Sequence, residues 1–144
     1  MPKSTATCNS LFALLFNATA WADLAENDTS APATNLYLSL HTASPGVGNS
    51  QLTNETAYTN YARIAVIRTT SGWSVPASGA TANAALAQFA QCGVTGATIT
   101  HVAIGTASSG AGTVLYQGAL SSSLAVAAGI QPQFAAAALQ ISET

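Results

Sequence analysis

A helical pattern of apolar residues begins near the start of the chain, at Ser10. Apolar side chains then recur three or four positions apart, which is the spacing of one face of an α-helix. Asn9 or Ser10 is expected to cap this helix, residues 1–9 are expected to be loose, and Pro32 ends the helical stretch. The predicted apolar stripe consists of Leu11, Leu14, Leu15, Ala18, Trp21 and Leu24.

After Pro32 the spacing changes to two residues, which indicates β-strands. In the segment 35–42 leucines alternate with polar residues and histidine, and Pro45 with Gly46 then turns the chain. The alanine-rich run 82–92 fits either a strand or a helix. Several short strands separated by turn residues predict an antiparallel β-sandwich or barrel. The predicted strands are 35–42, 61–69, 72–75, 82–92, 97–105, 113–119, 123–128 and 134–142.

Two of these predicted strands, 61–69 and 97–105, carry apolar residues on both faces. Strands of this kind are normally buried on both faces. Since one face of a small two-layer sandwich should meet water, we expect a second layer from the N-terminal helix or from another subunit. The chain is predicted to consist of an N-terminal arm and helix, residues 1–33, and a β-sandwich, residues 34–144, in one structural domain overall.

Composition changes this picture because the chain has very few charges. Only 6% of its 144 residues are charged, whereas ordinary globular chains carry about 25%. A neutral, Ser- and Thr-rich β protein would explain this, and so would a surface covered by partners, where charge is depleted; we favour the second explanation. Three cations and a net charge of −2 exclude nucleic-acid binding by charge. No apolar run approaches the roughly 20 residues needed to span a bilayer.

Two further features concern the compartment of the protein. Lys3 precedes the apolar run 11–16, which resembles a secretion signal, but six apolar residues are fewer than the roughly 7–15 that such signals need. Cys8 and Cys92 form no CxxC motif and cannot supply the four ligands of a structural zinc site. We expect free, reduced thiols, with Cys8 placed before any regular element.

Candidate chemistry is sparse. The histidines His41 and His101 lie on predicted strands without a nearby third metal ligand, so each is expected to be a hydrogen-bonded wall residue. Glu55 and Glu143 are far apart in the sequence, and no G-x-S-x-G motif occurs. The run GTASSGAG, residues 105–112, lacks the lysine of a phosphate-binding loop and is expected to be a hairpin turn. We therefore expect no catalytic, cofactor or metal site, and no enzyme.

Five stretches taken in order resemble small virion proteins of tailed bacteriophages, of the head decoration or cement type. The resemblance covers roughly residues 9–142, and related sequences are often labelled tail-fibre proteins. The stretches are NSLFALLFNATAW, NLYLSLHTASPG, NYARIAVIRTTSGWSV, ITHVAIGTASSGAGTVLYQGAL and AAGIQPQFAAAALQIS.

The resemblance implies a short N-terminal α-helix followed by an antiparallel, jelly-roll-like β-sandwich. It also implies a homodimer or trimer on the capsid exterior that binds the major capsid protein and cements neighbouring subunits against internal DNA pressure. Such a protein is made in the host cytoplasm and needs no nucleic acid, membrane or cofactor. The alternatives are a tail-fibre or receptor-binding knob that recognises host saccharide, and a small enzyme or ligand-binding sandwich.

Apolar and aromatic side chains are the best candidates for contact with partners. Trp73 follows a Ser71-Gly72 turn, so it fits either a rim anchor for a partner or a plug at the end of the sandwich. The predicted interface residues are Leu11, Leu14, Leu15, Phe16, Trp21, Tyr61 and Trp73.

Overall fold

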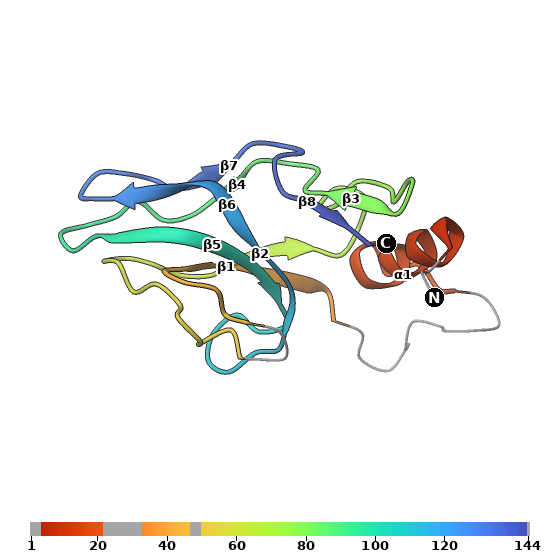
Figure 1. Cartoon of the computed structure of the whole chain (residues 1–144), viewed down its shortest axis with the longest axis horizontal. Coiled ribbons are helices and arrows are strands. Elements are labelled where there is room, and N and C mark those ends of the chain that lie inside the picture. Colours follow the sequence, from red (N-terminus) through yellow and green to blue (C-terminus); the bar gives the residue numbers. More distant parts are fainter. Residues whose placement is uncertain (1–3, 22–32, 47–49, 144) are drawn as a thin grey trace. The chain divides into compact units, whose positions relative to one another are not determined.

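The structure is a computed structural model of the chain and describes residues 4–21, 33–46 and 50–143 (Figure 1). It is mainly β, with one short N-terminal helix and antiparallel strand pairs, which confirms the predicted fold class. Among these residues the strands form a four-stranded sheet and two pairs. The order is β2-β1-β5-β6 in the sheet, with the pairs β3-β8 and β4-β7. The strands are β1 (Asn35–His41), β2 (Ile64–Ile67), β3 (Ala80–Ala82), β4 (Ala87–Gln88), β5 (Ala97–Gly105), β6 (Val114–Val126), β7 (Gln133–Phe134) and β8 (Gln140–Ser142).

The chain forms two compact units, each built from segments distant in sequence. The first contains Met1–Asn35, Val66–Ala87 and Phe134–Thr144, and the second contains Leu36–Ala65 and Gln88–Gln133. The N-terminal helix thus belongs to the same unit as two later segments of the chain.

The helix α1 (Thr5–Asn17) lies in the first unit and begins earlier than the sequence predicted. Ser4 caps it, because its hydroxyl accepts a hydrogen bond from the backbone N–H of Thr7 at 3.2 Å. The helix ends where Ala18 adopts a left-handed conformation with φ 51° and its N–H donates to the carbonyl of Ala13. The predicted start and cap were therefore wrong. Trp21 lies outside the helix, and Leu24 lies outside the described residues.

The buried side of α1 also differs from the predicted stripe. Cys8, Phe12 and Phe16, spaced four residues apart, are buried, whereas Leu11 and Leu14 are half-buried. The rings of Phe12 and Phe16 meet edge to face at 5.7 Å between centroids. Apolar residues surround the helix at positions 11–16, so their spacing alone does not define one face. Cys8, expected before any regular element, is thus part of the helical core.

The second unit is centred on the long antiparallel pairs of β1, β5 and β6. Strand β1 pairs with β5 from Tyr37 opposite Gly105 to His41 opposite His101. The predicted strands 35–42 and 97–105 are confirmed, and the predicted strands 113–119 and 123–128 are parts of the single strand β6. The core residues of the second unit are Leu36, Leu38, Leu40, Tyr58, Phe89, Cys92, Ile99, Ala103, Ile104 and Val126.

Other predicted strands were too long. The run 82–92 contains only the last residue of β3 and the short β4, the run 134–142 contains only the end of β7 and all of β8, and 72–75 contains only an isolated bridge of Trp73 to Asn83. In strand 61–69, Ala65 and Ile67 of β2 are exposed in the single chain, so the helix does not cover this face, and cover by another subunit stays a prediction. Strand β5 has no exposed residue from Ile99 onward, as predicted.

Candidate functional site

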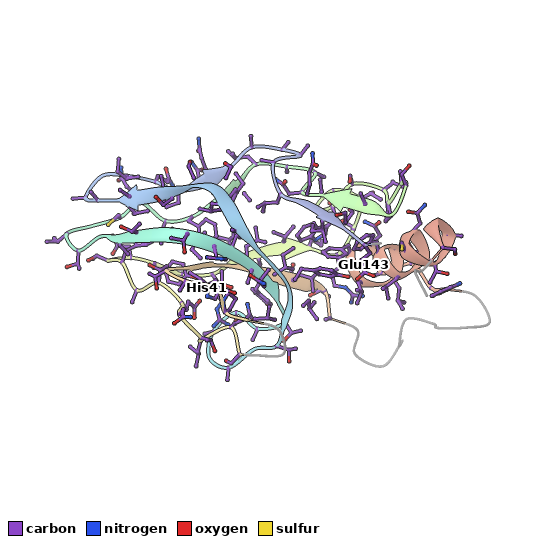
Figure 2. The ribbon with its side chains drawn as sticks, viewed as in Figure 1. His41 and Glu143 are labelled. Atoms are coloured by element: carbon purple, nitrogen blue, oxygen red, sulfur yellow. The ribbon has the colours of Figure 1, made fainter. Side chains whose placement is uncertain are left out.

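The histidine at the end of β1, His41, is completely buried and uses both ring nitrogens in hydrogen bonds (Figure 2). Its Nδ1 lies 2.9 Å from the backbone oxygen of Thr53, and its Nε2 lies 2.9 Å from the hydroxyl of Ser39. A carbonyl oxygen only accepts, so Nδ1 carries the proton and Nε2 accepts from Ser39. Neither nitrogen keeps a lone pair for a metal ion or a substrate.

The electrostatic environment keeps this imidazole neutral. Burial lowers the pKa of His41 below its usual value, and the bond to the carbonyl of Thr53 opposes that effect only in part. The nearby His101 is half-buried, and its Nδ1 lies 2.8 Å from the hydroxyl of Thr100. The prediction of hydrogen-bonded wall histidines is therefore confirmed for both residues.

The strongest polar cluster of the second unit joins Glu55 and Arg63. The guanidinium donates from Nε to Oε1 and from Nη2 to Oε2, both at 2.7 Å, which is a bidentate ion pair. The Arg63 side chain is 2% exposed and that of Glu55 11%. The hydrogen bond to Glu55 raises the pKa of Arg63, so the arginine is charged at all ordinary pH values.

Tyr61 completes this cluster. Its hydroxyl donates to Oε1 of Glu55 at 2.8 Å and accepts from the backbone N–H of Leu40 at 3.0 Å. Burial raises the pKa of Tyr61 well above its usual value. Its ring stacks on Phe89 with 6.3 Å between centroids. Each polar group of the cluster therefore has an internal hydrogen-bond partner, and the cluster holds these segments together.

The cluster fixes the turn between β5 and β6. Arg63 donates from Nη1 to the carbonyl of Ala107 at 2.9 Å and from Nη2 to the carbonyl of Gly110 at 2.8 Å. Ser108, within this turn, is exposed. The run 105–112 is thus a hairpin turn, as predicted, with its carbonyls held from inside.

A buried glutamine holds the base of the same turn. Oε1 of Gln51 accepts from the N–H of Ala107 at 3.0 Å. A Cβ added at Gly105 would lie 2.1 Å from Cδ of Gln51, and one added at Gly112 would lie 2.1 Å from its Oε1. At Gly112 the added Cβ would also lie 2.9 Å from the backbone nitrogen of Ala107, so close packing requires glycine there, whereas at Gly105 it would displace the end of the Gln51 side chain. Phosphate binding is not needed to explain this glycine pattern.

The first unit has its own buried arginine, at the C-terminal end of α1. Arg68 donates from Nη2 to the carbonyl of Leu14 at 2.7 Å and from Nε to that of Leu15 at 2.6 Å. These carbonyls belong to the last turn, where helix groups lack internal partners and a cation is favoured. Burial lowers the pKa of Arg68. Its role here is to cap the helix.

Glu143, on the same unit, lies next to α1 in Figure 2. Its backbone N–H donates to the carbonyl of Gly79 at 2.9 Å. Glu143 and Glu55 belong to different units, so neither unit contains both carboxylates. Within residues 4–21, 33–46 and 50–143, no group of three or more His, Cys, Asp or Glu side chains is arranged to hold a metal ion.

The structure separates the predicted interface residues into two sets. Phe16 and Trp73 are 0% exposed, and their rings meet at 4.7 Å inside the first unit, so Phe16 was wrongly placed on the surface and the rim-anchor alternative for Trp73 was wrong. Trp73 has the alternative role of an internal plug. The half-buried residues remain predicted contacts, and they are Leu11, Leu14, Leu15, Trp21 and Tyr61.

Sequence reasoning missed the two arginine sites. The signal was present, because both arginines lie in the apolar segment 61–69, where a charged side chain needs polar partners. Glu55 lies only eight residues from Arg63, but the Ala107 carbonyl lies 44 residues from Arg63 and the Leu14 carbonyl lies 54 residues from Arg68. A periodic pattern carries no information on such distant contacts.

Comparison with known proteins agrees with a viral structural role. No helix in the described part of the chain has the length and apolar character needed to cross a membrane. No curated protein matches the chain. The model of the family described as podophage GP4 fiber I protein gp80 matches residues 3–142, which supports the resemblance to phage virion proteins at the level of a fibre-related structural family. The chain therefore belongs to the podophage GP4 fiber I protein gp80 family.

Proposed function

We propose that this chain is a non-enzymatic structural subunit of a phage fibre, which acts through contacts with other virion proteins. The observation that carries the proposal is the family match, because it extends over residues 3–142 and its description names a fibre protein. The virion is accordingly the expected location.

The interior of the protein supports a mechanical role. The ion pair of Glu55 and Arg63 and the buried Gln51 hold the turn 105–112 with direct hydrogen bonds. A network in which every member is satisfied rigidifies the fold around it. A rigid turn and a nearly uncharged surface suit a part that packs against neighbours.

Saccharide recognition is not part of this proposal. Sugar-binding surfaces usually present aromatic rings, and here the rings of Trp73 and Tyr58 are buried. The ring of Tyr61 stacks on Phe89. These aromatics therefore stabilise the two cores, whereas Trp21, Tyr37 and Tyr116 are half-buried. The burial of Trp73 and Tyr58 is the reason that we favour a shaft or adaptor segment over a receptor-binding knob.

A capsid cement protein is the second candidate. The scarcity of charge favours it, because only 6% of the residues are charged and interfaces are depleted in charge. In this role the chain would bridge subunits of the major capsid protein on the outside of the shell. Many weak contacts repeated over the lattice would stabilise the filled head by linkage. The half-buried side chains of α1, such as Leu11 and Leu14, are its predicted contacts.

One experiment on virions distinguishes these functions. Virions are labelled with an antibody raised against the purified chain and imaged by electron microscopy, and a deletion phage is assayed for adsorption and for the temperature at which its heads release DNA. For a fibre subunit we expect label at a few sites on the tail, reduced adsorption and an unchanged release temperature. Label over the whole head with a lower release temperature would replace the fibre by the cement function. Unlabelled virions would overturn both.

A further inference from the structure

The end strand of the four-stranded sheet contains a short palindrome. Residues Ala119–Ala125 of β6 read Ala-Leu-Ser-Ser-Ser-Leu-Ala in both directions, with Ser122 at the centre. In the strand order β2-β1-β5-β6, β6 is bonded to β5 on one side only (Figure 1). The other side of β6 is therefore an edge without a strand in the described part of the chain.

This edge lacks most of the features that usually prevent strand pairing. Natural sheets protect an edge with a charged residue, a proline, a very short strand or a β-bulge, and of these β6 has the bulge alone. Strand β6 is 13 residues long and contains no charged residue and no proline. Ala119 and Ser121–Ala125 are exposed, and Leu124 is 37% exposed.

The same segment is only loosely engaged by its own sheet. Ala119 pairs with His101 and Leu124 pairs with Ile99, so the residues between them on β6 face a single residue, Thr100. This register shift is a β-bulge, and such bulges re-aim side chains or interrupt pairing with the neighbouring strand. The bulged residues are Leu120, Ser121, Ser122 and Ser123.

We propose that the β6 edge binds a second copy of this chain, with the two β6 strands antiparallel about a two-fold axis at Ser122. An antiparallel pair about such an axis places each residue opposite its mirror position in the segment. Ser122 then faces Ser122 of the partner subunit, and Leu120 faces Leu124 of the partner subunit. The occupant is a second copy because only a palindromic segment places like residues opposite each other along its whole length.

The palindrome also specifies the register. In this register the two Leu–Leu pairs and the central Ser122–Ser122 pair lie on one face of the new ladder, and the Ser121–Ser123 and Ala–Ala pairs lie on the other. A slip by two residues in either direction places one of the two leucines opposite Ser122, and a slip by one turns each leucine to the opposite face from its partner leucine. The contact is isologous and closes after two copies, joining two four-stranded sheets into one continuous sheet. This inference does not depend on where the chain lies in the virion.

The first test uses charge at the axis, because residue 122 faces itself. We expect the purified chain to be a dimer by sedimentation equilibrium across a dilution series. Ser122→Lys and Ser122→Glu each place two like charges opposite one another, so each should weaken the dimer about fivefold or more. An equimolar mixture of the two variants should form a mixed dimer at least as tight as the unsubstituted one. Ser109→Lys, at an exposed site on the β5–β6 turn, is the matched control and should leave the dimer unchanged.

The second test reports the register and does not depend on stability. Under mild oxidation Ser122→Cys should give a covalent dimer, because opposite residues in an antiparallel pair approach within disulfide range. Ser109→Cys should stay monomeric on a denaturing, non-reducing gel. The two native cysteines, Cys8 and Cys92, are free and buried, so cross-linking of the unsubstituted chain measures their contribution to the covalent dimer.

Three results would overturn the proposal. They are a purified chain that is monomeric throughout the dilution series, a dimer that Ser122→Lys leaves as tight as before, and equal cross-linking of Ser122→Cys and Ser109→Cys. Any of these would leave the fibre function unaffected, since that function is tested on virions.

Discussion

Arg63 and Glu55 form a bidentate ion pair in which both N–O distances are 2.7 Å and the arginine side chain is 2% exposed. The same guanidinium also binds the carbonyls of Ala107 and Gly110. One arginine therefore connects the segment before β2 with the turn between β5 and β6. The chain has three cationic residues, and one of them, Arg63, is used to hold this turn.

Removing either member of this pair should destabilise the protein strongly. Arg63→Ala and Glu55→Gln each leave a buried group without its partner, which costs about 3–5 kcal/mol in comparable cases. For a chain of this length, that loss lowers the melting temperature by about 10–17 °C. Differential scanning calorimetry gives the shift, and hydrogen exchange should show faster exchange of the amides in the turn 105–112.

The double variant Arg63→Met with Glu55→Leu is the control for this prediction. Replacing both members by apolar side chains avoids an isolated buried charge. The double variant should therefore lose less free energy of unfolding than the sum of the losses in the two single variants. Single variants that each cost less than about 1 kcal/mol would show instead that water screens the pair.

His41 should make stability depend on pH in a defined direction. Burial lowers its pKa in the folded state, so the unfolded chain binds the proton more tightly. The free energy of unfolding should therefore be at its full value above about pH 6.5, the unperturbed pKa. It should fall as the pH decreases below that value, with a slope of up to about 1.4 kcal/mol per pH unit. Urea titrations between pH 4.5 and 8 measure this slope.

Two variants assign the slope to one residue. His41→Gln keeps a donor for the Thr53 carbonyl and an acceptor for Ser39 but has no titrating ring, so it should flatten the pH dependence. His101→Gln, on the paired position of β5, should retain it. A slope that survives in His41→Gln would assign the pH dependence to other groups.

Strands β1 and β5 were predictable because their sequences carry the needed information locally. Alternating leucines mark β1, and glycines at 93, 96 and 105 mark the ends of β5. The start of α1 was not predictable in the same way. The sequence from Leu11 to Phe16 is apolar on every side, so the periodicity predicted a helix that begins where the leucines begin. In the structure the helix begins at Thr5, after the N-cap Ser4.

The two histidine positions were predictable from the sequence, whereas the arginine clusters were not. Sparse charge and isolated histidines correctly indicated hydrogen-bonded wall positions for His41 and His101. The burial of Phe16 was missed, because the run 11–16 is apolar on every side of the helix. For Trp73 both a surface anchor and a core plug were open, because an aromatic residue after a turn fits either until its packing partner is known. That partner is 57 positions away in the chain, beyond the reach of any local pattern.

Arg68 should stabilise α1 from outside the helix. Arg68→Ala removes hydrogen bonds from a charged donor to the carbonyls of Leu14 and Leu15, each of the kind that contributes about 1.5–3 kcal/mol. We expect a loss of at least about 2 kcal/mol in urea unfolding, with a smaller loss for Arg68→Lys because an ammonium lacks the fork geometry. Thr70→Ala, exposed and near in sequence, should change stability by less than about 0.5 kcal/mol. Equal effects of Arg68→Ala and Thr70→Ala would contradict the capping role.

The contact between Phe16 and Trp73 should determine both the stability and the fluorescence of the first unit. Phe16→Ala leaves a cavity beside a buried indole and should cost about 3–5 kcal/mol. Leu14→Ala, at a half-buried position of the same helix, should cost less, because less apolar area is lost from the core. Water that reaches the indole in Phe16→Ala should shift tryptophan emission to longer wavelength, and in a Trp73→Phe background this shift should disappear, since Trp21 is then the remaining tryptophan. If Phe16→Ala instead unfolds no more easily than Leu14→Ala, Phe16 is not a core residue, and its original assignment to a partner-facing surface of α1 becomes the better explanation.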